Sequence, residues 1–224
     1  MSDRLINADF TQRVVIKTND LPWVASPQPG VERRLLDRIG DEVARATSLV
    51  RYAPASTFPT HSHGLGEEFL VLEGVFSDEH GDYPVGTYVR NPPGSAHAPR
   101  TRPGCTILVK LRQMPPLKVD RVVIDTTSAP WTTGAAAGFA QLPLYSSAVT
   151  GEHVALETLD AGASAQPTDA KGEEIFVLSG QLADENGKYP AGSWIRNPIG
   201  YRSTLRSRAG AAYWVKRGHL RPII

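Results

Sequence analysis

The chain contains a long internal repeat, and this feature constrains the fold more than any other. Residues 67–94 and 173–200 align without a gap, beginning EEFLVLEG and EEIFVLSG and ending RNPPG and RNPIG. Shorter matches extend the repeat over nearly all of the 224 residues: VK at 109–110 and 215–216, and PW at 22–23 and 130–131. The repeat exceeds one hundred residues, too long for a solenoid, so it predicts two similar domains.

The sequence of each copy predicts short strands. Valine and threonine recur, and the 20 glycines and 18 prolines break the chain at short intervals. Segment 31–46 has apolar residues at nearly helical spacing, but its counterpart, 139–154, contains Pro143 and lacks that periodicity. We therefore predict hairpins in both copies, with the first turn at residues 39–42. The expected fold is all-β, with two tandem jelly-roll barrels at residues 1–115 and 116–224.

Composition excludes several classes of protein. The 24 Lys and Arg residues balance 23 Asp and Glu, so we expect no nucleic-acid partner. No apolar run reaches the length of a membrane span, and the N-terminal MSDRLINADF lacks the apolar core of a secretory signal. The single cysteine, Cys105, is expected to be a buried apolar residue, and the chain is expected to be cytoplasmic.

Three histidines of the first copy have the spacing of metal ligands. In HSHGLGE, strand alternation places His61 and His63 on one face, and Glu67 joins them if the next strand resumes in phase. His97 follows in the motif PPGSAH. Three imidazoles and a carboxylate suit Fe, Mn, Ni, Co or Zn, and on a six-coordinate metal they leave two positions open.

These residues carry a family resemblance. H-S-H-x3-E-x6-G at 61–74 resembles the first cupin motif, and G-x5-P-x-G-x2-H at 86–97 resembles the second. The surrounding sequence, from GEEFLVLEGVFSDEHGDYP to GCTILVKLRQ, resembles the cupin domain of ChrR-type anti-sigma factors. The resemblance implies a bicupin with one divalent transition metal (Zn, Fe, Mn or Ni) in the first barrel, held by His61, His63, Glu67 and His97.

We do not expect the resemblance to extend to one part of that family. ChrR-type anti-sigma factors carry an N-terminal zinc-binding helical domain with His and Cys ligands. Thr101 stands where the second motif of the family usually has Asn, a position that is often not a ligand, so this departure carries no weight. For the zinc-binding domain, no histidine precedes position 61 and no cysteine precedes position 105. Sigma-factor binding is therefore not supported by the sequence.

The second copy lacks the metal ligands. Pro167, Asp169 and Ser203 stand where the first copy has its histidines, so we expect a degenerate barrel kept for packing. The glutamate persists there as Glu173, which leaves open whether Glu67 is a ligand or a structural residue. Residues shared by the copies, such as Arg90 and Arg196, are expected to be scaffold. Four residues of the first copy are candidates for an apolar pocket: Phe58, Phe69, Val71 and Tyr88.

Two functions remain in competition. The first is a mononuclear metal-dependent dioxygenase-type enzyme acting on a small oxygenated organic molecule. The second is a ChrR-like sensor or regulatory cupin that binds Zn or a small ligand and acts on the transcriptional stress response through a partner. In either case the expected partner is a small molecule, and a homodimer is compatible with the sequence.

Overall fold

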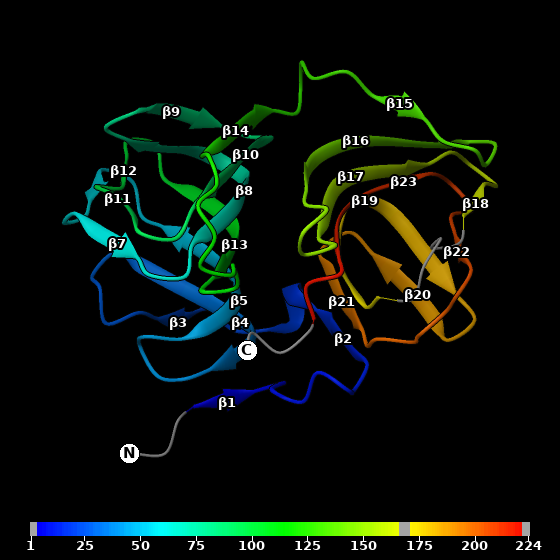
Figure 1. Ribbon diagram of the computed structural model, residues 1–224, viewed down its shortest axis with the longest axis horizontal. Helices are drawn as coiled ribbons and strands as arrows, with labels where there is room; N and C mark the ends of the chain where they lie inside the picture. The colour runs from blue at the N-terminus through cyan, green and yellow to red at the C-terminus, as the bar shows by residue number, and fades with distance from the viewer. Residues whose placement is uncertain (1–3, 166–170, 221–224) are drawn as a thin grey trace. The chain divides into compact units, whose positions relative to one another are not determined.

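The computed structural model describes residues 4–165 and 171–220. Within these ranges the regular structure is β-strand apart from one 3-10 helix, η1 (Thr18–Asp20), which confirms the all-β prediction (Figure 1). The chain forms two compact units. The first contains residues 4–8 and 22–128, and the second contains residues 9–21, 129–165 and 171–220.

The first unit is built on an antiparallel sheet. Its strand order is β1 (Leu5–Ile6), β4 (Val31–Ile39), β5 (Arg45–Tyr52), β13 (Cys105–Leu111), β8 (Glu67–Asp78), β10 (Thr87–Asn91) and β14 (Val122–Asp125). Short strands join it at the margins: β3 (Val24–Ala25), β6 (Ser56–Thr57), β9 (Gly81–Pro84) and β12 (Arg100–Thr101). A separate two-stranded sheet pairs β7 (His61–His63) with β11 (Ser95–His97).

The second unit repeats this order. Its sheet runs β15 (Thr132–Thr133), β16 (Phe139–Ser146), β17 (His153–Leu159), β23 (Ala211–Arg217), β19 (Glu173–Asp184), β21 (Ser193–Asn197) and β2 (Val14–Lys17). Three short strands complete it: β18 (Ser164–Ala165), β20 (Gly187–Pro190) and β22 (Leu205–Arg206). The described part of the second unit has no counterpart of the β7–β11 pair.

The two units exchange their edge strands. Strand β2 pairs with β21 of the second unit, and β14 pairs with β10 of the first. The same sequence, RVVI, lies at the start of both, at residues 13–16 and 121–124, with its arginine directly before each strand. The division expected from the sequence, 1–115 and 116–224, therefore differs from the two units in residues 9–21 and 116–128.

The hairpin prediction for segment 31–46 is confirmed. Strands β4 and β5 pair from Val31–Tyr52 to Ile39–Arg45, with a bulge between Leu35 and Asp37. The bulge explains the nearly helical spacing of the apolar residues, because an extra residue shifts the alternation of side chains between the two faces. The counterpart hairpin, β16–β17, has its own bulge between Pro143 and Tyr145.

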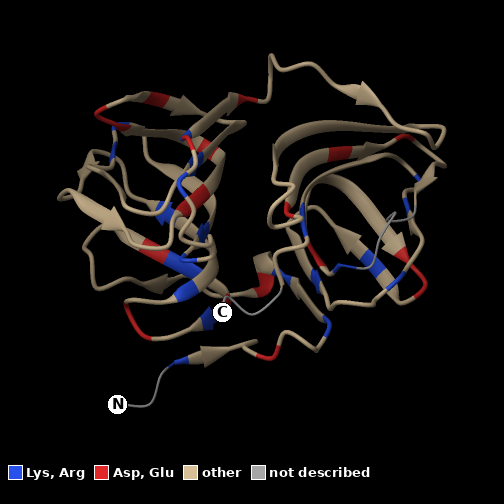
Figure 2. Cartoon of the chain, viewed as in Figure 1, with Lys and Arg blue, Asp and Glu red and all other residues tan. Residues whose placement is uncertain are grey.

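Each unit buries its own apolar core. In the first, the core includes Phe69, Val71, Phe76, Val89 and Ile107, and in the second Ile175, Val177, Ile195, Tyr213 and Val215. Basic and acidic residues are mixed along the strands of both units (Figure 2). No helix in the described ranges is long and apolar enough to cross a membrane.

Candidate metal centre

Strands β7 and β11 bring three imidazoles together. His61 and His63 lie on one face of β7 because side chains alternate along a strand, and His97 of β11 stands opposite His61 in the register. One ring nitrogen from each of the three lies within 4.8 Å of the others. His63 and His97 are buried, whereas His61 is exposed.

The turn at residues 64–66 sets the position of Glu67. Gly66 has a φ of +74°, and a Cβ there would stand 2.3 Å from the Met114 sulfur, so the turn favours glycine. Backbone bonds from Arg112 N to Gly66 O, 2.9 Å, and from Met114 N to Leu65 O, 3.0 Å, hold the turn. Strand β8 therefore starts at Glu67 with its carboxylate beside the histidines.

Glu67 lies between two of the imidazoles. Its Oε2 is 3.5 Å from His63 Nε2 and 3.6 Å from His97 Nε2. The same oxygen accepts a bond of 3.0 Å from the side-chain amide of Asn91. Burial raises the pKa of Glu67, so the protein alone favours its neutral form, and a cation at this point would favour the carboxylate.

The protonation of the histidines fits a metal. Burial, and then the neighbouring His61, lowers the pKa of His63 to about 4, and burial also lowers the pKa of His97. Both rings are therefore neutral near pH 7. His63 Nε2 and His97 Nε2 are buried, and within the described residues neither has a hydrogen-bond partner. Two unpartnered lone pairs beside a carboxylate are the donor set of a divalent transition metal.

Asp78 orients His97. The His97 Nδ1 lies 3.3 Å from Asp78 Oδ2, and because an ionised carboxylate only accepts, Nδ1 carries the proton and Nε2 keeps its lone pair. Burial opposes ionisation of Asp78, but hydrogen bonds from Tyr83 and from the His80 backbone hold its pKa below the ordinary value. His61 is oriented in the same sense, with Nδ1 3.3 Å from the carbonyl of Pro59.

An arginine from the exchanged strand completes this network. Arg121, directly before β14, donates to Asn91 Oδ1 at 2.8 Å, to the Tyr83 hydroxyl at 2.7 Å and to Asp78 Oδ2 at 3.3 Å. One side chain thus touches the partner of Glu67 and the partner of His97. The sequence analysis missed Arg121, although the repeated RVVI that contains it, in step with the repeated PW, could have revealed it.

The centre lies at the wall of a cavity of about 480 Å3. His61, His63 and Glu67 line it, and its remaining walls are largely apolar, with Val50, Phe58, Val109 and Leu111. Tyr52 also lines it, and burial, then the nearby Glu67, raises the pKa of that phenol. A volume of this size suits a small organic molecule.

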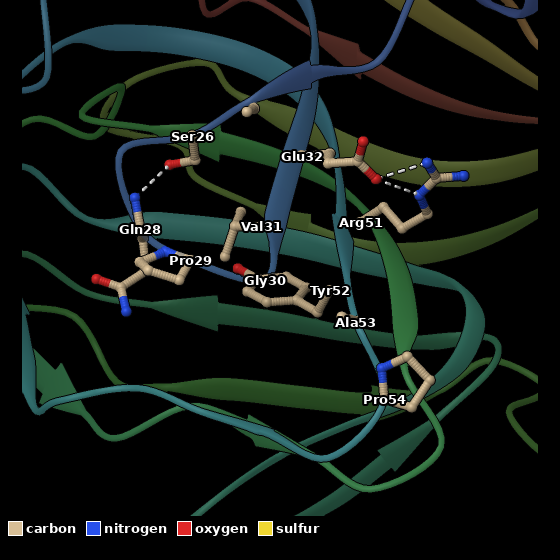
Figure 3. Close-up of a pocket in the computed structure, with 11 residues that line it drawn as sticks. Ser26, Gln28, Pro29, Gly30, Val31, Glu32, Arg51, Tyr52, Ala53 and Pro54 are labelled. Carbon is tan, nitrogen blue, oxygen red and sulfur yellow. Dashed lines mark hydrogen bonds and ion pairs between the residues drawn. The ribbon is translucent and has the colours of Figure 1, made fainter.

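A second cavity, of about 520 Å3, adjoins the first and shares Ser26, Gln28, Val31 and Tyr52 with it. Figure 3 shows that its charged residues, Arg51 and Glu32, bond to each other. It contains none of the histidines, so the candidate metal centre lies at the first of these two cavities.

The four pocket candidates lie in different places. Phe58 lines the cavity at the histidines, and Phe69 and Val71 lie in the core beneath it without lining it. Tyr88 does not line it either, so the assignments of Phe69, Val71 and Tyr88 to the pocket all need correction. It neighbours the core residue Val89 on the strand and so faces the other side of the sheet, where its hydroxyl donates to Glu68 at 2.8 Å. Arg90 pairs with the same carboxylate at 2.6 Å, consistent with a scaffold role.

The corresponding place in the second unit is filled by an arginine. Arg217 donates to Glu173 Oε2 at 3.0 Å and pairs with Glu157 through both of its terminal nitrogens. Ser203 is buried, and Pro167 and Asp169 lie outside the described residues. Among the residues described, the histidine cluster of the first unit is the group of potential metal ligands that the structure assembles.

Solved structures with similar folds include several proteins with named functions. A "putative dioxygenase" from Nostoc punctiforme has a TM-score of 0.77 at 16% identity, with 94% of this chain and 85% of that chain covered. Bacterial pirin YhhW from Escherichia coli, in complex with nickel(II), has a TM-score of 0.69 at 11% identity, covering 92% and 98%. A variant of oxalate decarboxylase from Bacillus subtilis has a TM-score of 0.62 at 11% identity, covering 91% and 76%.

At these identities the likeness establishes the fold, which is that of a bicupin with two jelly-roll barrels. No curated protein matches the chain. The model of the ChrR cupin-like domain matches twice, at residues 11–115 and 119–221, and each match includes the strand that is exchanged. The paired motifs, the repeated barrel and this double match show that the chain belongs to the ChrR cupin-like domain family.

Proposed function

We propose that the chain is a mononuclear metal-dependent enzyme of the dioxygenase type that acts on a small oxygenated organic substrate. The observation that carries the proposal is the convergence of two unpartnered, buried imidazole nitrogens and the Glu67 carboxylate at the wall of a cavity. His61, His63, Glu67 and His97 would hold the metal. When bound there, it would supply Lewis acidity toward a substrate oxygen and a place for dioxygen.

The protein itself would position the substrate and exclude water. The apolar side chains of Val50, Phe58 and Leu111 would pack against the carbon skeleton and keep the cavity dry. Tyr52 would keep its proton at neutral pH and would donate a hydrogen bond to a substrate oxygen. Arg112, also at the cavity, would attract a substrate with a carboxylate or enolate group.

The reaction balances without a further reductant. A dioxygenase places both atoms of O2 in its product, and the electrons that reduce the oxygen come from the carbon–carbon or carbon–hydrogen bonds of the substrate. The chain therefore needs only O2 and an oxidisable substrate such as a diketone or a phenolic ketone.

The first test is the metal content of protein purified without added metal, measured by elemental mass spectrometry. We expect about one equivalent per chain in the wild type and almost none in His97→Ala. Ser203→Ala, at the matching position of the second unit, serves as the control and should keep its metal. No metal in any of the three proteins would contradict the proposal.

The second test is oxygen consumption with a panel of small diketones and phenolic ketones. Fe, Mn or Ni in the protein together with O2 uptake that His97→Ala abolishes would support the enzyme. Zn in the protein with no uptake across the panel would contradict it and would favour a ligand-binding or regulatory role for the same site.

A further inference from the structure

The second unit has its own cavity, of about 490 Å3, and none of the three clustered histidines lines it. Strands β16, β17 and β23 supply its polar wall, with Gln141, His153, Glu157, Tyr213 and Arg217. Phe139 and Leu205 supply an apolar wall. The cavity is thus as large as the one at the metal centre but differs from it in chemistry.

A buried ion cluster forms the floor of this cavity. Glu157 is 2% exposed and Glu173 is 5% exposed, and both carboxylates pair with the guanidinium of Arg217. Burial opposes the charge on Arg217, but the neighbouring carboxylates raise its pKa above the ordinary value, so the cluster stays ionised. Buried charges of this kind are costly to desolvate and seldom contribute net stability.

The first unit shows that the fold does not need these polar groups. The strand register places Arg217 opposite His153 and Tyr213 opposite Glu157. At the matching places of the first unit, Leu111 lies opposite Ala46 and Ile107 opposite Val50. Four apolar residues build the same barrel in one unit, so the four polar residues of the other unit require a different explanation.

Part of the hydrogen-bonding capacity in the cavity is not used within the described residues. The Tyr213 hydroxyl is buried, the residue is 1% exposed, and the hydroxyl lies near Glu157 without forming a hydrogen bond of ordinary geometry to a described residue. Arg217 uses three of its five N–H groups on the two carboxylates. Burial, and then Glu157, raises the pKa of Tyr213, so its hydroxyl keeps a proton to donate.

The charges around the cavity indicate what kind of molecule it accepts. The two cations, Arg217 and Lys171, balance the two carboxylates, Glu157 and Glu173. A net charge on the ligand would disturb this balance next to buried ionised groups. A hydroxyl group both donates and accepts, so neighbouring hydroxyls match a floor where N–H donors and carboxylate acceptors alternate.

We propose that the barrel of the second unit is a metal-independent binding site for a small neutral polyhydroxylated molecule, a sugar or a polyol. Arg217 and Glu157 would bond adjacent hydroxyls, and Tyr213 would donate to a third oxygen. The ring of Phe139 would pack against the C–H face of the ligand. The sequence analysis predicted a degenerate barrel kept only for packing, and this proposal gives that barrel a binding function.

The test is isothermal titration calorimetry of the full chain with D-glucose, D-ribose, D-mannitol and myo-inositol, and with lactate and ethanolamine as charged comparisons. We expect at least one neutral compound to bind. Tyr213→Phe should weaken that binding about tenfold, because it removes one hydrogen bond to the ligand. Tyr189→Phe, which removes a hydroxyl that instead donates to Asp184 in the same barrel, is the matched control and should bind as the wild type does.

A triple variant removes the three buried charges together: Glu157→Val and Arg217→Leu copy the first unit, and Glu173→Gln leaves no unpaired carboxylate beside them. It should lose binding while its melting temperature stays within a few degrees of the wild type. No binding by any neutral compound, binding of the charged compounds alone, or unchanged binding by the triple variant would each overturn the proposal. A triple variant that unfolds much earlier than the wild type would also overturn it, because the cluster would then be structural.

Discussion

The two barrels of this chain share one hydrogen-bond network but differ in the residues around a common glutamate. In the first, Arg121 bonds Asn91, Tyr83 and Asp78, and in the second, Arg13 bonds Asn197, Tyr189 and Asp184 in the same pattern. Beside these matching networks, Glu67 faces the Nε2 atoms of His63 and His97, which have no hydrogen-bond partner among the described residues, whereas Glu173 faces the guanidinium of Arg217.

This difference separates the role of the frame from the role of the site. Each barrel places a glutamate at the same point, next to an asparagine amide at 3.0 Å. What the glutamate does depends on the residue opposite it in β13 or β23, which is Leu111 in one unit and Arg217 in the other. With a leucine there, the carboxylate is available to a metal. With an arginine there, the carboxylate forms an ion pair instead.

The largest effect is expected from changing the two glutamates. Glu67→Gln should lower metal affinity about a hundredfold and leave the stability of the metal-free protein unchanged, because burial already disfavours its charge. Glu173→Gln should leave metal binding intact and lower the free energy of unfolding by about 3 kcal/mol, because Arg217 loses a buried partner. Metal titration and urea unfolding measure the two quantities. If Glu67→Gln behaves like Glu173→Gln, then Glu67 is structural.

The next comparison uses the two matching arginines. Arg121→Met should lower metal affinity by about 10- to 100-fold, because Asp78 and Asn91 lose the side chain that holds them against His97 and Glu67. Arg13→Met breaks the same bonds in the second unit and should not change metal affinity. Both variants should lose similar stability, about 2 kcal/mol. Equal metal affinities in the two variants would show that Arg121 acts on the fold alone.

A smaller effect is expected at the turn before each glutamate. Gly66 and Gly172 both have positive φ, but an added Cβ would stand 2.3 Å from the Met114 sulfur in one case and 3.0 Å from Leu220 in the other. Gly66→Ala should therefore cost about 1.5 kcal/mol, since the Met114 side chain can shift, and Gly172→Ala about 1 kcal/mol in thermal unfolding. A larger loss from Gly172→Ala would contradict the assignment of Gly66 as the tighter turn.

The smallest effect concerns the core position held by Cys105 in one barrel and by Ala211 in the other. Burial raises the pKa of the Cys105 thiol to about 11, so this thiol should react very slowly with alkylating reagents near pH 8. Because the folded-state pKa lies above that of the unfolded chain, its contribution to stability is full below about pH 8.5 and falls as the pH rises toward 11. Cys105→Ala should remove this dependence, which unfolding at pH 8 and pH 10 can measure. Fast alkylation of the native protein would contradict the buried assignment.

Local patterns in the sequence were enough for much of the fold. The repeat predicted two barrels. Segment 31–46 has nearly helical spacing, but its counterpart at 139–154 does not, so a hairpin was predicted for both, and both are hairpins in the structure. The HSH spacing predicted that His61 and His63 share a face, and the structure brings both beside His97. These features depend on strand alternation, which short stretches of sequence reveal.

The exchange of β2 and β14 was decided by tertiary structure alone. RVVI occurs in both copies, and either strand has the same residues to offer to β10 or β21. The barrel that each strand joins depends on the path of the connecting chain in space. Comparing the two copies of the sequence does not reveal that path. For that reason the sequence suggested a boundary at residue 115 and did not include Arg121 in the metal centre.

The chain's sequence by itself determined the β-strands, their duplication and the set of histidines, because each follows from spacing along the chain. Only the tertiary structure decided three other features. Tyr88 faces away from the cavity, Arg121 belongs to the first barrel, and Arg217 donates a hydrogen bond to Glu173 in the second. These three outcomes depend on which residue of a distant strand stands opposite, since pairing between strands, rather than order along one strand, determines what a buried charge meets.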